Sequence, residues 1–191
     1  MPSAGLNQTR VVEEAEQIAD EIGLHRLTLT LLAARVGVRQ PSLYKHIDGL
    51  PGLHRSITIR GKLELADALA RAAVGRSAGE AVAAMAHAYR RWAREHPGRY
   101  TAAQSAPTPG DVEDDVASSA VVGVLTDVLA GYELTGEDAI DAIRFVRAAL
   151  HGFVSLESPS AGAFALPVDI DRSFDRLVHA VVTSLADWDH Q

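Results

Sequence analysis

Apolar residues recur at helical spacing along most of the chain. Near the N-terminus, Val11, Ala15 and Ile18 are followed by Ile22, so that successive members lie three or four residues apart. This spacing places them on one face of a helix. No segment shows the sustained alternation of apolar and polar positions that indicates a strand. The pattern therefore predicts an all-α protein.

Capping and turn residues divide the chain into separate helices. Asn7 is a suitable N-cap for a helix over about 8–22, and Thr28 for one over 29–36 that Gly37 ends. Further helices are expected over about 40–47, 51–73, 78–96, 97–100, 111–134, 135–157 and 170–187. The clearest loops are 107–110 and 158–168, which contain proline and glycine.

Residues 27–47 meet the physical requirements of a helix–turn–helix. Ala33 is small enough for two helices to cross closely, and Gly37 can adopt the positive φ of a sharp turn. The expected shared core consists of Val36, Val38, Leu43 and Ile47. The residues left facing outward are Arg39, Gln40, Ser42, Tyr44, Lys45 and His46. These donors suit DNA phosphates and base edges, whereas the alternative is a purely structural helical hairpin.

The net charge of −7 conceals two parts of opposite sign. Residues 1–62 carry a net charge of +2, and residues 63–191 carry −9. Between Arg26 and Lys62, seven basic residues accompany one acid, Asp48. This segregation fits a module that neutralises DNA phosphates, although a solvated basic face would show the same counts.

The run from Val11 to Leu53 resembles the TetR family of bacterial transcriptional regulators, most specifically over Thr28–Val38 and Ser42–Ile47. The resemblance implies a three-helix helix–turn–helix DNA-binding domain over 1–53. It also implies a long helix leading into a helical effector-binding and dimerisation domain over 54–191. A homodimer formed mostly by the last two helices is implied as well.

The resemblance also implies roles for individual residues. Those assigned to DNA are Thr28, Arg39, Gln40, Pro41, Ser42, Tyr44, Lys45 and His46. Tyr44 and either Lys45 or His46 would contact the phosphate backbone, and 39–42 would face the groove. Arg39 departs from the family, which often has a small hydroxyl residue there to cap the recognition helix, and it could contact guanine instead.

The second half is similar to the TetR subgroup whose effector domain carries a His-Gly signature. The matching stretches are 92–100, 151–157 and 162–164 leading to 171–174. The residues expected to line the effector pocket are Tyr89, Trp92, Tyr100, Arg147, His151 and Phe164. Arg147 stands where the subgroup often has an aromatic residue. His151 suits a core position as well as a pocket wall.

The last two long helices each show an apolar stripe, and the final one adds Leu177 and Val182 beside it. Paired wide surfaces of this kind suit a two-fold four-helix interface. An entirely intramolecular core would explain the stripes almost as well.

Several kinds of chemistry are not expected. The chain has no cysteine, and its eight histidines form no metal-ligand spacing, so neither a metal nor a cofactor is predicted. Gly75-Arg76-Ser77-Ala78-Gly79 matches the G-x-S-x-G pattern of hydrolases, but a nucleophile elbow needs a preceding strand. Ser77 and Glu80 instead suit a capping box. We expect no catalytic residue, no secretory signal and no membrane span, hence a cytoplasmic protein.

The leading hypothesis is therefore a homodimeric transcriptional regulator that binds a double-stranded DNA operator and is released from it, as a repressor, by a small-molecule effector. One alternative is a helical protein that binds a small molecule or a protein partner and has lost specific DNA binding. A hydrolase is the other alternative, and it rests on the G-x-S-x-G match alone.

Overall fold

The computed structural model describes residues 6–158 and 162–188, and within them every regular element is a helix, as the periodicity predicts. The chain forms two compact units. The N-terminal unit comprises Met1–Glu64 and Glu95–Ser118, and the C-terminal unit comprises Leu65–Arg94 and Ser119–Gln191. The expected functional boundary between residues 53 and 54 stays a prediction.

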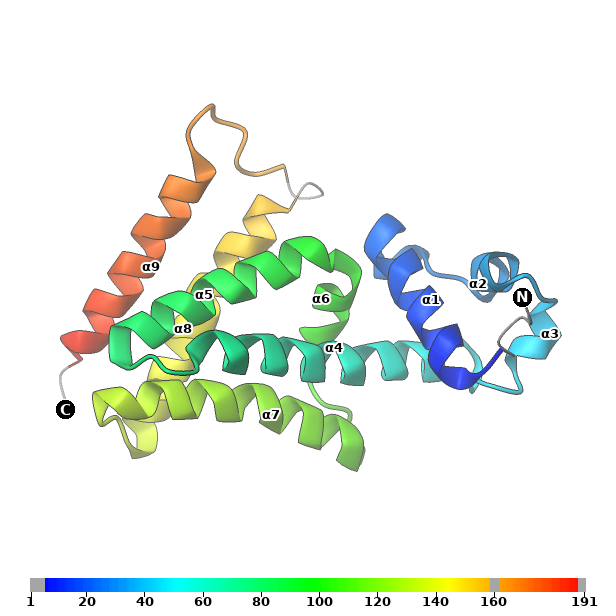
Figure 1. Cartoon of the computed structure of the whole chain (residues 1–191), viewed down its shortest axis with the longest axis horizontal. Coiled ribbons are helices and arrows are strands. Elements are labelled where there is room, and N and C mark those ends of the chain that lie inside the picture. The colour runs from blue at the N-terminus through cyan, green and yellow to red at the C-terminus, as the bar shows by residue number, and fades with distance from the viewer. Residues whose placement is uncertain (1–5, 159–161, 189–191) are drawn as a thin grey trace. The chain divides into compact units, whose positions relative to one another are not determined.

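The N-terminal unit contains short helices and parts of two longer ones (Figure 1). Its complete elements are α1 (Gln8–Ile22), η1 (Leu24–Arg26), α2 (Leu29–Val36), α3 (Gln40–Leu43) and α6 (Pro97–Ala103). It also holds the first part of α4 (Gly49–Ala73) and the start of α7 (Val112–Leu129). The Asn7 side chain accepts a hydrogen bond from the Arg10 amide at 2.9 Å, which confirms the expected N-cap of α1.

One hydrophobic core joins the helices of this unit. Its fully buried members include Val11, Ala15, Leu32, Leu43, Leu53, Ile57 and Ala102. The expected core positions Leu43 and Ile47 are buried, and Val36 and Val38 pack against the cluster while partly exposed. Ala102 comes from α6, so a helix distant in sequence completes the core of the helix–turn–helix.

The first turn of α6 lies directly against the end of α1. A Cβ atom at Gly98 would meet the carbonyl carbon and oxygen of Ala19 at 2.2 Å, so only glycine fits there. The Asp20 carboxylate accepts hydrogen bonds from the amides of Gly98 and Arg99, each at 2.9 Å. An acidic side chain of α1 thereby satisfies two amides that α6 leaves unpaired at its N-terminus.

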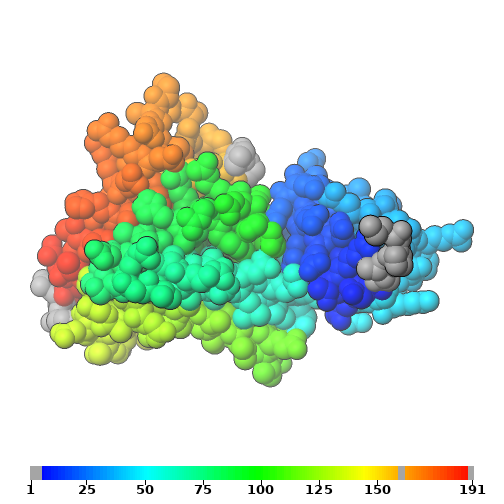
Figure 2. Space-filling model, viewed as in Figure 1, coloured from blue at the N-terminus to red at the C-terminus, as the bar shows by residue number. Residues whose placement is uncertain are grey.

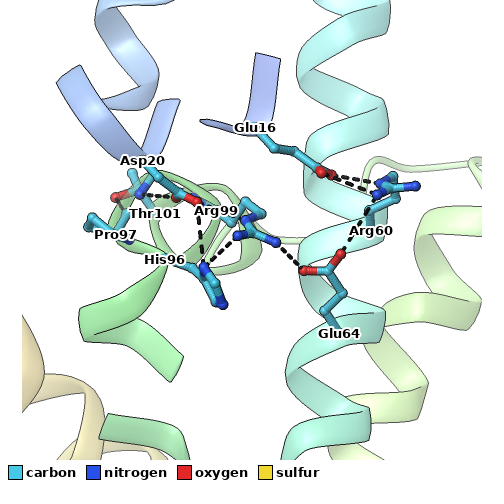
Figure 3. A network of polar contacts seen from close by, with 9 residues as sticks. Glu16, Asp20, Arg60, Glu64, His96, Pro97, Arg99 and Thr101 are labelled. Carbon is cyan, nitrogen blue, oxygen red and sulfur yellow. Dashed lines mark hydrogen bonds and ion pairs between the residues drawn. The ribbon is translucent and has the colours of Figure 1, made fainter. Parts of the chain in front are cut away.

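Charged side chains of α1, α4 and α6 form a network within the same unit (Figure 3). Arg99 donates to Asp20 at 2.9 Å and to Glu64 at 2.6 Å, and Arg60 donates to Glu16 at 2.7 Å. Glu16 is only 3% exposed. Burial raises the pKa of Glu16 above its ordinary value, although the hydrogen bond from Arg60 opposes that shift.

The C-terminal unit is also helical. Besides the end of α4 and the second part of α7, it contains α5 (Ala78–Glu95), η2 (Ala130–Tyr132), α8 (Gly136–Glu157) and α9 (Ile170–Ala186). α8 packs against α9, and the buried residues Val146, Leu150 and Phe174 come from these two helices. The Asp169 side chain caps α9 by accepting from the amides of Asp171 and Arg172.

Two local predictions are wrong in detail. The helix expected over 40–47 ends at Leu43, and 44–46 form hydrogen-bonded turns in which the His46 amide donates to the Leu43 carbonyl at 2.8 Å. At the start of α5, the Glu80 amide donates to the Ser77 carbonyl at 3.1 Å. The expected acceptor was the Ser77 hydroxyl of a capping box.

The segment Val112–Tyr132 is apolar enough to qualify the expectation that the chain has no membrane span. By length and composition alone it could span a membrane. Val112, Val116 and Val122 on α7 are 73%, 61% and 45% exposed in the isolated chain. Such a composition is weak evidence for a membrane span, because helices of proteins that cross no membrane can have the same length and apolar composition.

Glycines 98 and 123 should respond oppositely to alanine. Gly98→Ala forces a methyl group into the Ala19 carbonyl and should destabilise the protein by about 3 kcal/mol. Gly123→Ala adds a methyl group to α7 where no atom lies within 4 Å, and should stabilise it by about 0.5–1 kcal/mol. Urea unfolding followed by circular dichroism measures both. Equal effects would show that α6 does not contact α1 in this way.

Removal of Arg60 should lower the free energy of unfolding, because it leaves a buried carboxylate without its counter-charge. Arg60→Ala leaves Glu16 without its bidentate partner and should cost about 3–5 kcal/mol at neutral pH. The loss should shrink as the pH falls toward the raised pKa of Glu16, since a protonated carboxyl needs no counter-charge.

The matched control is Arg71→Ala, which breaks the ion pair to Asp67 on the surface of α4. Both of those side chains are more than half exposed, so this variant should lose less than about 1 kcal/mol at every pH. Unfolding curves at several pH values compare the two variants. A pH-independent loss in Arg60→Ala would contradict the proposed role of Glu16.

Candidate nucleic-acid interface

The turn between α2 and α3 has the geometry that the sequence predicts. Thr28 caps α2, its hydroxyl oxygen accepting from the Leu31 amide at 3.2 Å. Gly37 adopts the left-handed conformation, with φ 71° and ψ 31°. The next amide, that of Val38, donates back to the Ala33 carbonyl at 3.0 Å. This is a Schellman-type helix end, and it reverses the chain within a few residues.

The start of α3 is held by α2 and by its own backbone. The Thr30 hydroxyl donates to the Gln40 side-chain oxygen at 3.2 Å, which links the first turn of α2 to the first turn of α3. The Ser42 amide donates to the Arg39 carbonyl at 2.9 Å. Arg39 occupies the N-cap position without capping through its side chain, so the guanidinium group is available at the surface.

The residues predicted to contact DNA share one continuous segment and its α2 neighbour. Pro41, Lys45 and Arg39 are exposed, and Tyr44 is 57% exposed although it is a large aromatic residue. Gln40, Ser42 and His46 are half-buried, and Thr28 is exposed beside its cap. Figure 2 shows the light blue atoms of the α2–α3 region projecting from the N-terminal unit. Their roles toward DNA stay a prediction.

The basic surface is smaller than the charge count suggests. Four of the seven basic residues between 26 and 62 are engaged by carboxylates. They are Arg35 with Glu21, Arg55 with Asp111 and Glu113, Arg60 with Glu16, and Lys62 with Asp114. Within the described residues Arg26, Arg39 and Lys45 have no ion pair, and all three lie in or beside the helix–turn–helix.

One of these paired cations, Lys62, is buried together with its carboxylate partner. It is 2% exposed, and its ammonium group lies 2.5 Å from a carboxylate oxygen of Asp114, which is 3% exposed. Burial raises the pKa of Asp114, but hydrogen bonds from Lys62 and Thr108 outweigh burial and hold it below its ordinary value. Arg55 similarly lowers the pKa of Asp111 to about 2. These cations hold the start of α7 and cannot contact phosphates without breaking those pairs.

The six residues predicted to bind an effector come from α5, α6, α8 and the segment that precedes α9. Tyr89 and Trp92 are buried on α5, and Tyr100 is buried on α6, which belongs to the other unit. Phe164 is 42% exposed and its ring packs on that of Phe153, with centroids 5.1 Å apart. Their assignment to an effector pocket stays a prediction.

The other two effector candidates lie one turn apart on α8. Arg147 is exposed, and His151 is half-buried, with its ring 3.4 Å from the Ser155 hydroxyl. Burial and then the charge of Arg147 lower the pKa of His151. The ring is therefore neutral at neutral pH, which suits a core position and a pocket wall alike.

Sequence reasoning missed a buried arginine that ties three helices together in the C-terminal unit. Arg90 is 6% exposed, and its guanidinium group contacts Glu157 at 2.5 and 2.8 Å and Asp171 at 2.7 Å. It also lies 4.7 Å from the ring centre of Phe174. The sequence does contain an indication of this burial, because Arg90 falls on the apolar face of α5 between Tyr89 and Ala93.

The G-x-S-x-G segment is a turn between two helices, since α4 ends at Ala73 and α5 begins at Ala78. Gly75 has a φ of 73° and ends the preceding helix. A Cβ at Gly79 would lie 2.7 Å from a methyl group of Val182, so the second glycine permits close packing on α9. The strand that a nucleophile elbow requires is replaced by α4.

Comparison with known proteins adds independent evidence. Residues 82–181 match the family model of the tetracyclin repressor-like C-terminal domain. The chain is 40% identical over 155 residues to Rv0681, an uncharacterized HTH-type transcriptional regulator of Mycobacterium tuberculosis, covering 81% of this chain and 71% of that protein. It is 36% identical over 162 residues to YobS, an uncharacterized HTH-type transcriptional regulator of Bacillus subtilis, covering 84% and 83% of the two chains.

A solved structure supports the fold at lower identity. The crystal structure of a TetR variant from Acinetobacter baumannii in complex with minocycline superimposes with a TM-score of 0.69 at 18% identity, covering 96% of this chain and 98% of that one. These comparisons leave the resemblance to the His-Gly subgroup untested. Together with the helix–turn–helix geometry and the all-helical architecture, they show that the chain belongs to the TetR family of helix–turn–helix transcriptional regulators.

Proposed function

We propose that the protein is a repressor that binds operator DNA through residues 39–46 and releases it when a small molecule binds. The observation that carries the proposal is the concentration of unpaired positive charge and exposed donors on the helix–turn–helix. Arg39 and Lys45 flank a short helix whose backbone is fixed by the Gly37 turn and by the Thr30–Gln40 hydrogen bond. Fixed donors beside unpaired cations suit a major groove lined by phosphates.

The response to an effector follows from differential binding. Two recognition helices of a dimer must lie about 34–36 Å apart to enter successive major grooves. An effector that binds more tightly to a different spacing shifts the population away from the DNA-binding form. The complex of the Acinetobacter TetR variant with minocycline supports a small molecule as the signal. The protein would act in the cytoplasm as a binding protein without catalytic activity.

A stripe on α8 supports the homodimer. Phe145, Ala148, Gly152 and Leu156 follow one another at intervals of three or four residues, so they share one face of the helix. Ala148 is exposed, Leu156 is 47% exposed, and a Cβ at Gly152 would meet nothing within 4 Å. Small residues between two large apolar ones allow a second helix to approach closely. We assign this stripe, together with α9, to the two-fold interface.

Substitutions on the recognition segment should weaken DNA binding without unfolding the protein. Lys45→Ala removes an exposed cation with no ion pair in the described chain, and should reduce affinity at least about tenfold because a dimer loses two phosphate contacts. Tyr44→Phe removes one hydroxyl donor and should reduce it by a smaller factor. Fluorescence anisotropy measures both on a duplex enriched from a random-sequence library by the wild-type protein.

The control is Arg144→Ala, which removes a positive charge from the exposed surface of α8. Among the described residues Arg144 pairs only with the exposed Asp141. This variant should bind the duplex with wild-type affinity. If the wild-type protein enriches no sequence, the proposal of operator binding is wrong and the alternative of a binding protein without DNA recognition stands. Wild-type affinity in Lys45→Ala would place the phosphate contacts elsewhere.

Dimerisation should depend on the small residues of the α8 stripe. Gly152→Glu places a charge where nothing lies within 4 Å in a single chain, so the monomer should fold but associate at least about a hundredfold more weakly. Thr126→Glu, on the exposed surface of α7, is the control and should leave association unchanged. Sedimentation velocity over a range of concentrations measures both. If the Gly152→Glu variant dimerises as the wild type does, position 152 of α8 does not lie in the interface.

A further inference from the structure

The turn that carries the G-x-S-x-G pattern borders a cavity in the C-terminal unit. The cavity is open to solvent, has a volume of about 400 Å³ and is bordered by the last turns of α4, the first turns of α5 and the C-terminal end of α7 with η2. Figure 1 shows the α4–α5 turn beside that end of α7. Its volume is in the range of small-molecule sites. None of the six residues predicted to bind an effector lines it.

The cavity exists because the helices that meet there carry small side chains. Alanines 70, 73, 78 and 81 and Gly131 contribute much of the wall. A Cβ at Gly131 would lie 3.2 Å from the Ala78 amide nitrogen, so the two backbones nearly touch at that point. Val124 and Val128 supply the rest of an aliphatic surface. An aliphatic group placed against this surface would remove apolar surface from water.

The backbone at the edge of the cavity is strained. Ala78 has a φ of 42°, in the left-handed region that costs an alanine about 1–2 kcal/mol. Contacts on both sides hold it there, with Gly131 against Ala78 and Gly79 against Val182. Strain that persists because its surroundings fix it is common at ligand sites. Here it determines where residues 76–78 lie relative to the apolar wall.

Polar groups of opposite charge stand at the rim. The Arg76 guanidinium donates through one nitrogen to the Ala72 carbonyl at 2.7 Å, which anchors the cation at the C-terminus of α4, where the helix dipole favours it. Its other nitrogens have no hydrogen bond within the described residues. Asp127 lines the same cavity, and its carboxylate has no ion pair within the described residues. Ser77 lines the cavity as well.

We propose that this cavity binds a small zwitterion with an aliphatic body, of the chemical class of the branched-chain α-amino acids. The aliphatic body lies against the alanine and valine wall, the ligand carboxylate pairs with Arg76, and the ligand ammonium group pairs with Asp127. A simple fatty acid would leave Asp127 facing its carboxylate, and a simple amine would leave Arg76 facing its ammonium group. One ligand that carries both charges satisfies both rim residues.

The proposal is tested by nuclear magnetic resonance titration of the full chain in the absence of DNA. L-leucine is the probe. The matched probes are 4-methylpentanoate and 3-methylbutylamine, which keep the aliphatic body of leucine and carry one charge each. Leucine should shift the amide resonances of Ala78 and Gly131 in a saturable manner. Each singly charged probe should bind at least about fivefold more weakly, since it loses one charged hydrogen bond.

Substitutions at two exposed rim residues distinguish leucine binding at this site from binding elsewhere on the protein. Arg76→Gln and Asp127→Asn should each weaken leucine binding at least about fivefold, and Arg144→Gln on α8 should leave it unchanged. Both rim residues are exposed, so the variants should keep the wild-type unfolding midpoint. The absence of saturable shifts at these two amides, equal binding of 4-methylpentanoate, or wild-type affinity in both rim variants would overturn the proposal. Because no DNA is present, the outcome is independent of whether residues 39–46 bind an operator.

Discussion

The helix–turn–helix depends on a contact between two backbones. Gly98 brings the first turn of α6 against the Ala19 carbonyl, and Asp20 then accepts hydrogen bonds from two α6 amides. No other residue type could stand at position 98 without moving one helix. α6 thereby becomes a structural part of the N-terminal unit, and its Ala102 side chain belongs to the hydrophobic core of that unit. Any displacement of α6 must be accompanied by α1 or must break this contact.

Charged residues reinforce that contact where apolar ones could not. α1, α4 and α6 meet through Glu16, Arg60, Glu64, Asp20 and Arg99. Glu16 is buried, and each of the other four contacts more than one partner. The geometry of such a network is directional, so it favours one relative arrangement of the three helices over others of similar buried area. A purely hydrophobic seam would tolerate more slippage.

The parts of the fold that sequence predicts are those governed by neighbours along the chain. The Thr28 cap, the left-handed Gly37 and the bounds of α1, α2 and α9 follow from local chemistry, and the structure has them as expected or within one residue. α3 is shorter than its periodicity suggests because the Leu43 carbonyl accepts from His46 in a tighter turn. The candidate site could be predicted less completely from the sequence.

Asp111 and Asp114 neutralise Arg55 and Lys62 from about fifty residues away, and no local sequence pattern predicts such pairs. That Tyr44 and Lys45 are exposed is established only by the fold.

The withdrawal of those cations into ion pairs has a consequence for DNA affinity. Each chain presents Arg26, Arg39 and Lys45 as cations without a carboxylate partner in the described structure. A dimer on one operator would then displace about six condensed counterions, and the logarithm of its association constant would fall with that of the salt concentration with a slope of about −5. Seven cations per chain would have given a slope near −13 and strong attraction to any duplex. Pairing four of the seven basic residues between 26 and 62 would therefore limit the affinity for arbitrary DNA, so that base contacts would supply a larger share of the binding free energy.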